Sequence, residues 1–182
     1  AGLTADNGQA LAGFDSGADD QEPRAGVSAR TFKDALARWA STVTLVAARV
    51  DYGRGILGTT VTSFFPMAAE PPLVGVSLGA SAQVLPALQD GADYVVNLLA
   101  RDQRRIASAY ADSYPVGPSP FPDEGPPVVE GALVSLLCRV VSVHPVEGGA
   151  RVVVGRVEEV VDGSGEEPLL YWQRGYHGLD AG

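Results

Sequence analysis

The stretch "GTTVTSFFPMAAEPPLVGVSLGASAQ" (residues 58–83) carries the pattern that decides the fold. Its β-branched and apolar segments predict two strands, over 56–64 and 73–78. Small side chains allow a flat ligand to approach the main chain, and hydroxyls with exposed N–H groups suit carbonyls and phosphates. Threonines are also ordinary strand residues, so a purely structural role is an alternative. The small hydroxyl residues after Gly58 are Thr59, Thr60, Thr62 and Ser63.

Four further segments are rich in β-branched and apolar residues, and each predicts a strand. Between the segments 132–146 and 150–161, Gly148-Gly149 is a hairpin signal. Six strand candidates, mostly joined by short turns, predict an all-β antiparallel barrel decorated with small helices. No G-x-G-x-x-G pattern opens a helix after a strand, which argues against a Rossmann dinucleotide site. The four additional strands are predicted over 42–50, 93–99, 132–146 and 150–161.

Three short helices are predicted between and before these strands. The first is expected over 31–40, with Thr31 opening a loose capping box. The second is expected over 81–90, beginning at Ser81, with Pro86 either kinking it or lying in its first turn. The third is expected over 101–111. The start of the second helix would offer free N–H groups to an anion, although a plain N-cap explains Ser81 equally well.

The remaining segments are read from their composition. Residues 1–29 are poor in large apolar side chains and are expected to form a flexible arm, or one ordered by a partner subunit. The folded domain is expected over residues 30–182. Residues 112–127 contain six prolines, which predicts an ordered loop or lid rather than a strand. Residues 168–179 close the domain.

Charge and cysteine content exclude several classes of function. The net charge of −9 disfavours nucleic acid and anionic membranes as partners. No apolar run is long enough for a transmembrane helix, and residues 1–20 do not resemble a secretory signal. The single cysteine, Cys138, lies in an apolar run and predicts a buried thiol, with neither a disulfide nor metal-ligand spacing. A cytoplasmic protein fits this pattern.

Familiar catalytic motifs are absent from the sequence. It contains no G-x-S-x-G elbow and no P-loop. The two histidines, His144 and His177, are candidates for a general base, but a structural or surface role is the more frequent one for an isolated histidine. No residue is therefore assigned as a catalytic acid or base.

Several segments together resemble the flavin reductase family, which has the FMN-binding split-barrel fold. The resemblance extends from about residue 31 to residue 179. It is carried by "FKDALARWASTVTLVAA" (32–48), by the stretch 58–83, by "YVVNLLARDQRRIASAYA" (94–111), and by "PLLYWQRGYHGL" (168–179). No single segment is decisive, but their order along the chain is that of the family.

The resemblance implies an enzyme that transfers hydride from NADH or NADPH to FMN or FAD, often to supply a flavin-dependent monooxygenase. It also implies a homodimer with the flavin site built across the two subunits. The hydride moves between two bound rings, so no side-chain acid or base is required. The residues that match the family's flavin site are Thr59, Thr60, Val61, Thr62, Ser63, Ser77, Ala80, Ser81, Ala82, Gln83, Tyr176 and His177.

One departure from the family keeps two alternatives open. Many members carry Gly-Asp-His in the turn before the last long strand, whereas this chain has Gly148-Gly149-Ala150. One alternative is a flavin-binding protein of the same fold with a different electron donor. The other is a dimeric binding module that holds no flavin.

Overall fold

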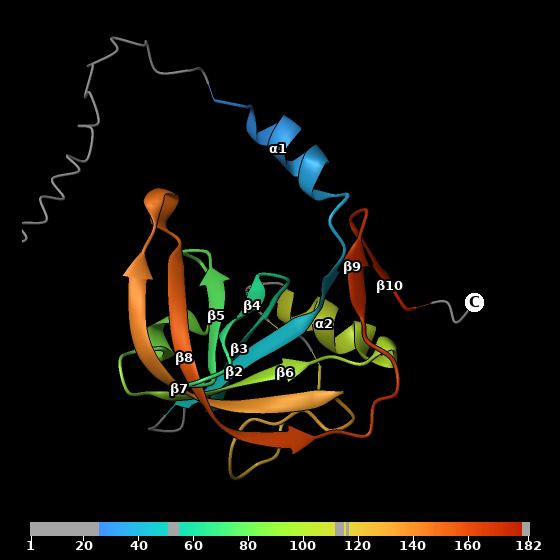
Figure 1. The fold of residues 1–182 in the computed structure, drawn as a ribbon. Helices are drawn as coiled ribbons and strands as arrows, with labels where there is room; N and C mark the ends of the chain where they lie inside the picture. Colours follow the sequence, from blue (N-terminus) through green and yellow to red (C-terminus); the bar gives the residue numbers. More distant parts are fainter. Residues whose placement is uncertain (1–25, 51–54, 112–114, 116, 180–182) are drawn as a thin grey trace, which may run out of the picture.

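The computed structural model describes residues 26–50, 55–111, 115 and 117–179, which form an antiparallel β-barrel with small helices (Figure 1). The predicted all-β barrel is therefore confirmed. Residues 1–25, which make up most of the expected N-terminal arm, lie outside the described residues. None of the helices within the described ranges combines the length and apolar character that a bilayer crossing requires.

Seven strands form the main sheet in the order β3–β2–β6–β7–β8–β5–β4, and all neighbouring strands are antiparallel. Two neighbouring pairs, β2 with β6 and β5 with β8, are not consecutive in the chain, as in a Greek-key arrangement. The strands are β2 (Thr44–Val50), β3 (Gly55–Val61), β4 (Phe64–Ala68), β5 (Leu73–Leu78), β6 (Asp93–Leu98), β7 (Val134–Pro145) and β8 (Arg151–Asp162).

The seam of the barrel lies where β3 ends and β4 begins. These two strands are the opposite edges of the sheet, yet only Thr62 and Ser63 separate them in the chain. The sheet must therefore curl until its edges approach each other, without a ladder of hydrogen bonds between them. The single strand predicted over 56–64 is wrong, because the chain crosses from one edge to the other at these two residues. The Ser77 N–H on β5 donates to the Ser63 carbonyl at 3.2 Å and fixes the crossing.

Side chains alternate between two apolar cores on opposite faces of the sheet. On β2, Val46 lies in the core inside the barrel and Leu45 in the core outside it. In the inner core, the Tyr94 hydroxyl lies over Gly155 so closely that any Cβ at that glycine would overlap it. The outer core is covered by helix α2 (Arg104–Ala111), which confirms the helix predicted over 101–111.

The predicted hairpin between the last two long strands is confirmed. Strand β7 pairs with β8 through an antiparallel register that ends at Pro145 and Arg151. Gly148 and Gly149 in the turn have φ angles of 80° and 84°. These are left-handed conformations that glycine adopts without strain, so the two glycines permit this tight turn.

A second, small sheet consists of β1 (Ser41–Thr42), β9 (Leu170–Trp172) and β10 (Gly175–His177). The strand predicted over 42–50 is therefore split, since its first residues pair with β9 and the rest joins the barrel. Between the two parts, the Val43 N–H donates to the Leu169 carbonyl at 2.9 Å. This bond fixes the small sheet to the barrel next to the seam.

Helix α1 (Ala29–Leu36) projects from the barrel, and none of its residues is buried (Figure 1). The hydroxyl of Ser28 caps it by accepting the Thr31 N–H at 3.1 Å. The predicted start at Thr31 and the predicted end near residue 40 are both wrong. The helix starts earlier because the Ser28 hydroxyl already accepts an N–H of its first turn. The apolar residues at helical spacing face outward: Phe32, Leu36 and Trp39 are 54%, 50% and 70% exposed.

The helix predicted over 81–90 is also wrong. Only one turn of 3₁₀ helix, η1 (Leu85–Ala87), forms there, with Pro86 in its first turn. Residues 79–84 form turns instead, because the Ala82 N–H bonds to the Gly79 carbonyl at 3.0 Å. Ser81 therefore does not begin a helix.

The described part of the proline-rich loop has no helix or strand, as predicted, and buried polar side chains hold its later residues to the barrel. Asn97 is completely buried. Its Nδ2 donates to the carbonyls of Leu45 and Pro127, and its Oδ1 accepts the Val129 N–H and the Ser135 hydroxyl. All four bonds are between 2.7 and 3.2 Å long. We call these five residues the Asn97 cluster.

Candidate functional site

Two adjoining hollows lie along the seam of the barrel, and we call them together the hydroxyl groove. Their volumes are about 210 and 360 Å³. They share Thr60, Val61 and Ala111 as lining residues. The first hollow is also lined by Thr59, Leu78, Gly79, Ser81, Ala82, Gln83 and Tyr110, and the second by Val43, Thr62, Ser63, Tyr171 and Tyr176.

The groove gathers most of the residues that the sequence predicted as a site. They come from the end of β3, the crossing to β4, the turns after β5, and β10. These segments meet because the two edge strands approach each other at the seam. The predicted residues found in the lining are Thr59, Thr60, Val61, Thr62, Ser63, Ser81, Ala82, Gln83 and Tyr176.

Three predicted residues do not line the groove. The main chain of Ser77 is used to hold the seam, and its carbonyl accepts the Ser63 hydroxyl. Ala80 lies in the turn between the lining residues Gly79 and Ser81, but Ala80 itself does not line the groove. A ring nitrogen of His177 lies 3.0 Å from the Trp172 carbonyl, and this contact holds the ring within its own hairpin.

The hydroxyls of the groove differ in what they bind. The Thr59 hydroxyl accepts the Val84 N–H at 3.3 Å, so it holds the start of η1. The Thr60 Oγ1, by contrast, is buried and has no hydrogen-bond partner among the described residues. An unsatisfied buried hydroxyl is costly and rare in native proteins. Thr60 therefore has hydrogen-bonding capacity that the fold itself does not use.

The turn over residues 79–83 also leaves hydrogen-bonding groups unused. Within the described chain, the N–H of Ala82 bonds to Gly79, whereas none of the hydrogen bonds uses the N–H groups of Ala80, Ser81 or Gln83. Successive main-chain N–H groups in a turn form a concave site that suits an anion. The sequence predicted an anion site at the start of a helix, whereas in the structure the unused N–H groups belong to a turn.

Sequence reasoning predicted Tyr176 but missed two other aromatic residues of the groove, Tyr110 and Tyr171. Tyr110 of α2 lies against β3, and a methyl group at Gly58 would be 2.9 Å from its ring. Tyr110 also contacts the Phe121 ring edge-on, with 5.5 Å between centroids. Burial raises the pKa of Tyr110, so it remains a neutral phenol. Its position on the buried face of a predicted helix was the available signal. Tyr171 contacts Tyr176 at 5.6 Å on the other wall.

The lining of the groove carries no charged side chain among the residues that the structure describes. No Lys, Arg, His, Asp or Glu is among the residues that line either hollow. Clusters of His, Cys, Asp and Glu suited to a metal ion are also absent from the described part of the chain. The groove can therefore bind a ligand through hydroxyls, main-chain N–H groups and aromatic rings, and its described lining offers no charged side-chain acid or base.

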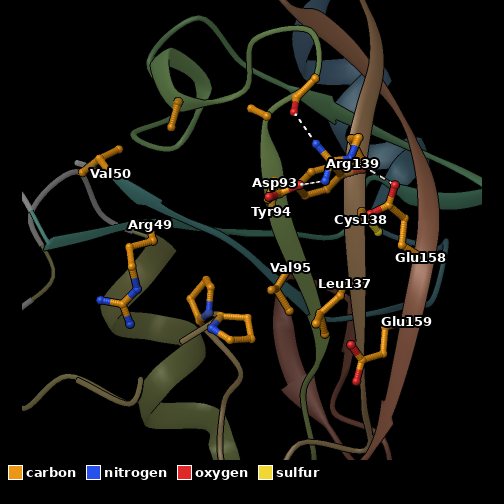
Figure 2. A pocket seen from close by; sticks show the side chains of 15 residues that line it. Arg49, Val50, Asp93, Tyr94, Val95, Leu137, Cys138, Arg139, Glu158 and Glu159 are labelled. Atoms are coloured by element: carbon orange, nitrogen blue, oxygen red, sulfur yellow. Dashed lines mark hydrogen bonds and ion pairs between the residues drawn. The ribbon is translucent and has the colours of Figure 1, made fainter. Parts of the chain in front are cut away.

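A larger cavity of about 780 Å³, which we call the outer cavity, lies elsewhere on the barrel and shares no lining residue with the groove. Val95 and Leu137 lie at its centre, from neighbouring strands (Figure 2). At one end, Arg139 forms ion pairs with Asp93 and Glu158, at 3.1 and 3.0 Å (Figure 2). The Arg139 cation is therefore already compensated by two carboxylates.

Arg49, on another wall of the outer cavity, is also engaged by the protein (Figure 2). Its guanidinium donates to the carbonyls of Pro122, Asp123 and Gly125 at 2.7 to 3.0 Å. It thus secures the proline-rich loop. Both cations of the larger cavity are occupied by structural bonds, so the smaller groove is the better candidate for a functional site.

Cys138 is buried, as predicted, and burial raises the pKa of its thiol to about 12. A thiol with such a pKa is not a nucleophile near neutral pH. His144 is exposed on β7, where its ring nitrogen lies 2.8 Å from the Ser142 hydroxyl. Neither residue lines the groove.

Comparison with known proteins gives consistent matches. Residues 36–180 match the family described as "Flavin reductase like domain". The chain is 42% identical to the reductase component of 4-hydroxyphenylacetate 3-monooxygenase from Thermus thermophilus, over 81% of this chain and 95% of that protein. It is 33% identical to an NADH-dependent flavin reductase from a Rhodococcus species, over 81% and 85%. The solved structure of the flavin reductase PheA2 superposes with a TM-score of 0.74 at 28% identity, covering 85% of this chain and 99% of that one.

Proposed function

The chain belongs to the flavin reductase-like domain family, and on that premise we propose that it is an NAD(P)H-dependent flavin reductase whose flavin binds in the hydroxyl groove. The observation that carries this assignment is the unused hydrogen-bonding capacity of the groove. It comprises the buried Thr60 hydroxyl and the N–H groups of Ser81 and Gln83, with the N–H group of Ala80 beside them in the same turn. A flavin has ring carbonyls, a hydroxylated chain and a phosphate, so it matches these groups in kind.

The groove residues divide by chemistry into two parts. Thr60, Val61, Thr62 and Ser63 would hold the ring and the ribityl chain, while Ala80 to Gln83 would hold the phosphate. The aromatic walls, including Tyr176, suit a flat ring system. A bound flavin accepts a hydride from a reduced nicotinamide, which explains why a neutral groove suffices.

In this proposal, the electron donor for the flavin is a reduced nicotinamide nucleotide. The Rhodococcus relative is named as NADH-dependent, which supports NADH. The turn Gly148-Gly149-Ala150 has neither acid nor imidazole, so this chain would hold the nicotinamide through other groups. Because reduced nicotinamide nucleotides are kept in the cytoplasm, we place the enzyme there. The name of the Thermus relative supports a monooxygenase as the consumer of reduced flavin.

A homodimer completes the site in this proposal. The exposed apolar residues of α1 form an uncovered face, which is unusual unless another surface covers it. Helix α1 is fixed to the hairpin that carries Tyr176, through an ion pair between Asp34 and Arg174 and a 2.9 Å bond from the Gln173 N–H to the Ala37 carbonyl. A second copy packed on α1 would therefore also lie close to the groove. Analytical ultracentrifugation of the intact chain tests this, and a monomer at micromolar concentration would contradict it.

The proposed activity is tested by the absorbance spectrum of the purified protein and by assays of NADH and NADPH oxidation with FMN or FAD. Flavin reduction by either nucleotide is expected. Flavin binding without reduction would favour the alternative electron donor. The absence of both flavin absorbance and quenching of flavin fluorescence would favour a flavin-free module.

The phosphate assignment is tested by Ser81→Glu, which places a carboxylate beside the unused N–H groups. The dissociation constant for FMN should rise at least tenfold, since like charges repel at short distance. Ser164→Glu is the matched control, because it makes the same change at an exposed position outside the groove. Equal FMN affinity in the two variants would remove the phosphate from this turn.

A further inference from the structure

Strand pairing places one cation beside the turn over residues 79–83. Arg151 is the first residue of β8 and pairs directly with Leu78, the last residue before that turn. The hairpin tip just before Arg151 also touches the turn, because a Cβ on Gly149 would lie 3.4 Å from the Cβ of Ala80. Arg151 is thus adjacent to the proposed phosphate site, although it does not line the groove itself.

The guanidinium of Arg151 is only lightly held. Its Nη1 donates to the carbonyls of Gly149 and Ala150, both at 3.1 Å. None of the ion pairs among the described residues involves Arg151. This contrasts with Arg139, which is fixed between Asp93 and Glu158. Two hydrogen bonds to neutral carbonyls of its own turn are easily exchanged for a charge-assisted bond.

We propose that Arg151 is the specificity-determining residue that selects phosphorylated flavins. Its guanidinium leaves the Gly149 and Ala150 carbonyls and binds the phosphate held by the N–H groups of Ala80 to Gln83. This inference rests on the proposed function of the groove. It supplies the one element that the neutral lining lacks, because a phosphate dianion bound only by neutral donors in a protein of net charge −9 gains little over riboflavin.

Arg151 touches neither of the reacting rings in this assignment, so it is not a catalytic residue. Its removal should weaken the binding of FMN and leave the turnover number unchanged. Riboflavin, which has the same ring and chain without the phosphate, should be bound equally well by both forms. The ratio of FMN to riboflavin affinity is therefore the quantity that isolates Arg151.

The chain provides a matched control on the same strand. Arg156 is exposed on β8, whereas Arg151 is half-buried, and Arg156 pairs with Leu73 at the opposite end of β5. The two arginines are five positions apart along an extended strand, which is about 17 Å. Arg156→Gln removes the same charge from the same strand, away from the turn, and so corrects for the change in net charge.

The experiment compares the intact wild type with Arg151→Gln, Arg151→Lys and Arg156→Gln. Dissociation constants for FMN and riboflavin are measured by fluorescence quenching, and KM and kcat by NADH oxidation. We expect about tenfold weaker FMN binding in Arg151→Gln, unchanged riboflavin binding, and partial recovery in Arg151→Lys. Arg156→Gln should resemble the wild type.

The outcomes separate this inference from the function on which it rests. If FMN and riboflavin weaken together, or if neither changes in Arg151→Gln, the selection role is wrong while the reductase can stand. If the wild type binds flavins but oxidises neither NADH nor NADPH, the reductase is wrong while the binding ratio still tests Arg151. A wild type that binds no flavin overturns both.

Discussion

The hydroxyl groove and the Asn97 cluster are built from similar neutral side chains, yet they use their hydrogen-bonding groups differently. Asn97 makes four hydrogen bonds and has no capacity left. The Thr60 hydroxyl makes none with the described residues, and three N–H groups of the neighbouring turn are likewise unused within that part of the chain. Both residues lie in segments that carry the resemblance to the family. Residues whose bonds are complete hold the fold, whereas residues with unused bonds are available to a ligand.

The outer cavity shows that volume alone does not identify a site. It is larger than either hollow of the groove. Its arginines are nevertheless occupied, Arg139 by two carboxylates and Arg49 by three loop carbonyls. A ligand there would have to displace bonds that the fold already makes.

The largest expected effect is in the Asn97 cluster. Asn97→Ala leaves the buried Val129 N–H without its Asn97 partner and removes the bonds to two carbonyls and to the Ser135 hydroxyl, so the free energy of unfolding should fall by about 3–5 kcal/mol. Urea denaturation followed by circular dichroism measures this loss. Ser135→Ala, which removes one bond of the same cluster, should cost about 1 kcal/mol. Equal free energies of unfolding for Asn97→Ala and the wild type would show that the bonds of Asn97 do not hold the fold, and the contrast with the groove would then be wrong.

An intermediate effect on stability is expected from Cys138, which lies in the core inside the barrel. Burial raises the pKa of the Cys138 thiol from 9.0 in its ordinary environment to about 12 in the folded chain. The unfolded chain therefore loses this proton first, and stability should fall between pH 9 and about 12 by up to 1.4 kcal/mol per pH unit, on the order of one proton. Denaturation at several alkaline pH values checks this. Cys138→Val should reduce the slope of the free energy of unfolding against pH. An unchanged slope would assign the loss of stability at alkaline pH to other groups.

The smallest effect on stability is expected where a hydroxyl has no partner. Thr60 and Tyr94 both have buried hydroxyls without one among the described residues, so Thr60→Val and Tyr94→Phe should not lower the free energy of unfolding and should each raise it by up to about 1 kcal/mol. Only Thr60→Val should weaken flavin binding, by several-fold, because Tyr94 lies inside the barrel and not in the groove. Equal flavin affinity in both variants would mean that the Thr60 hydroxyl is not a ligand.

Local patterns were sufficient for most of the fold. Runs of β-branched and apolar residues predicted β5 to β8 nearly to their ends, and the glycine pair predicted the hairpin between β7 and β8. The errors fell where contacts far apart in the chain decide. The seam divides the predicted strand 56–64, and a bond between Ala82 and Gly79 replaces the predicted helix at Ser81. Helical spacing predicted α1 but not that its apolar side would be exposed.

The amino-acid sequence by itself determined which segments form strands and where the small hydroxyl residues lie, because periodicity and side-chain size act over a few neighbouring residues. The tertiary structure alone decided which of those hydroxyls have partners. It also brought Arg151 beside the turn at Ala80, across a sheet whose paired strands are more than seventy residues apart in the chain. Hydrogen-bond satisfaction and charge proximity depend on strand order and barrel closure, and these arise from long-range pairing that no local pattern specifies.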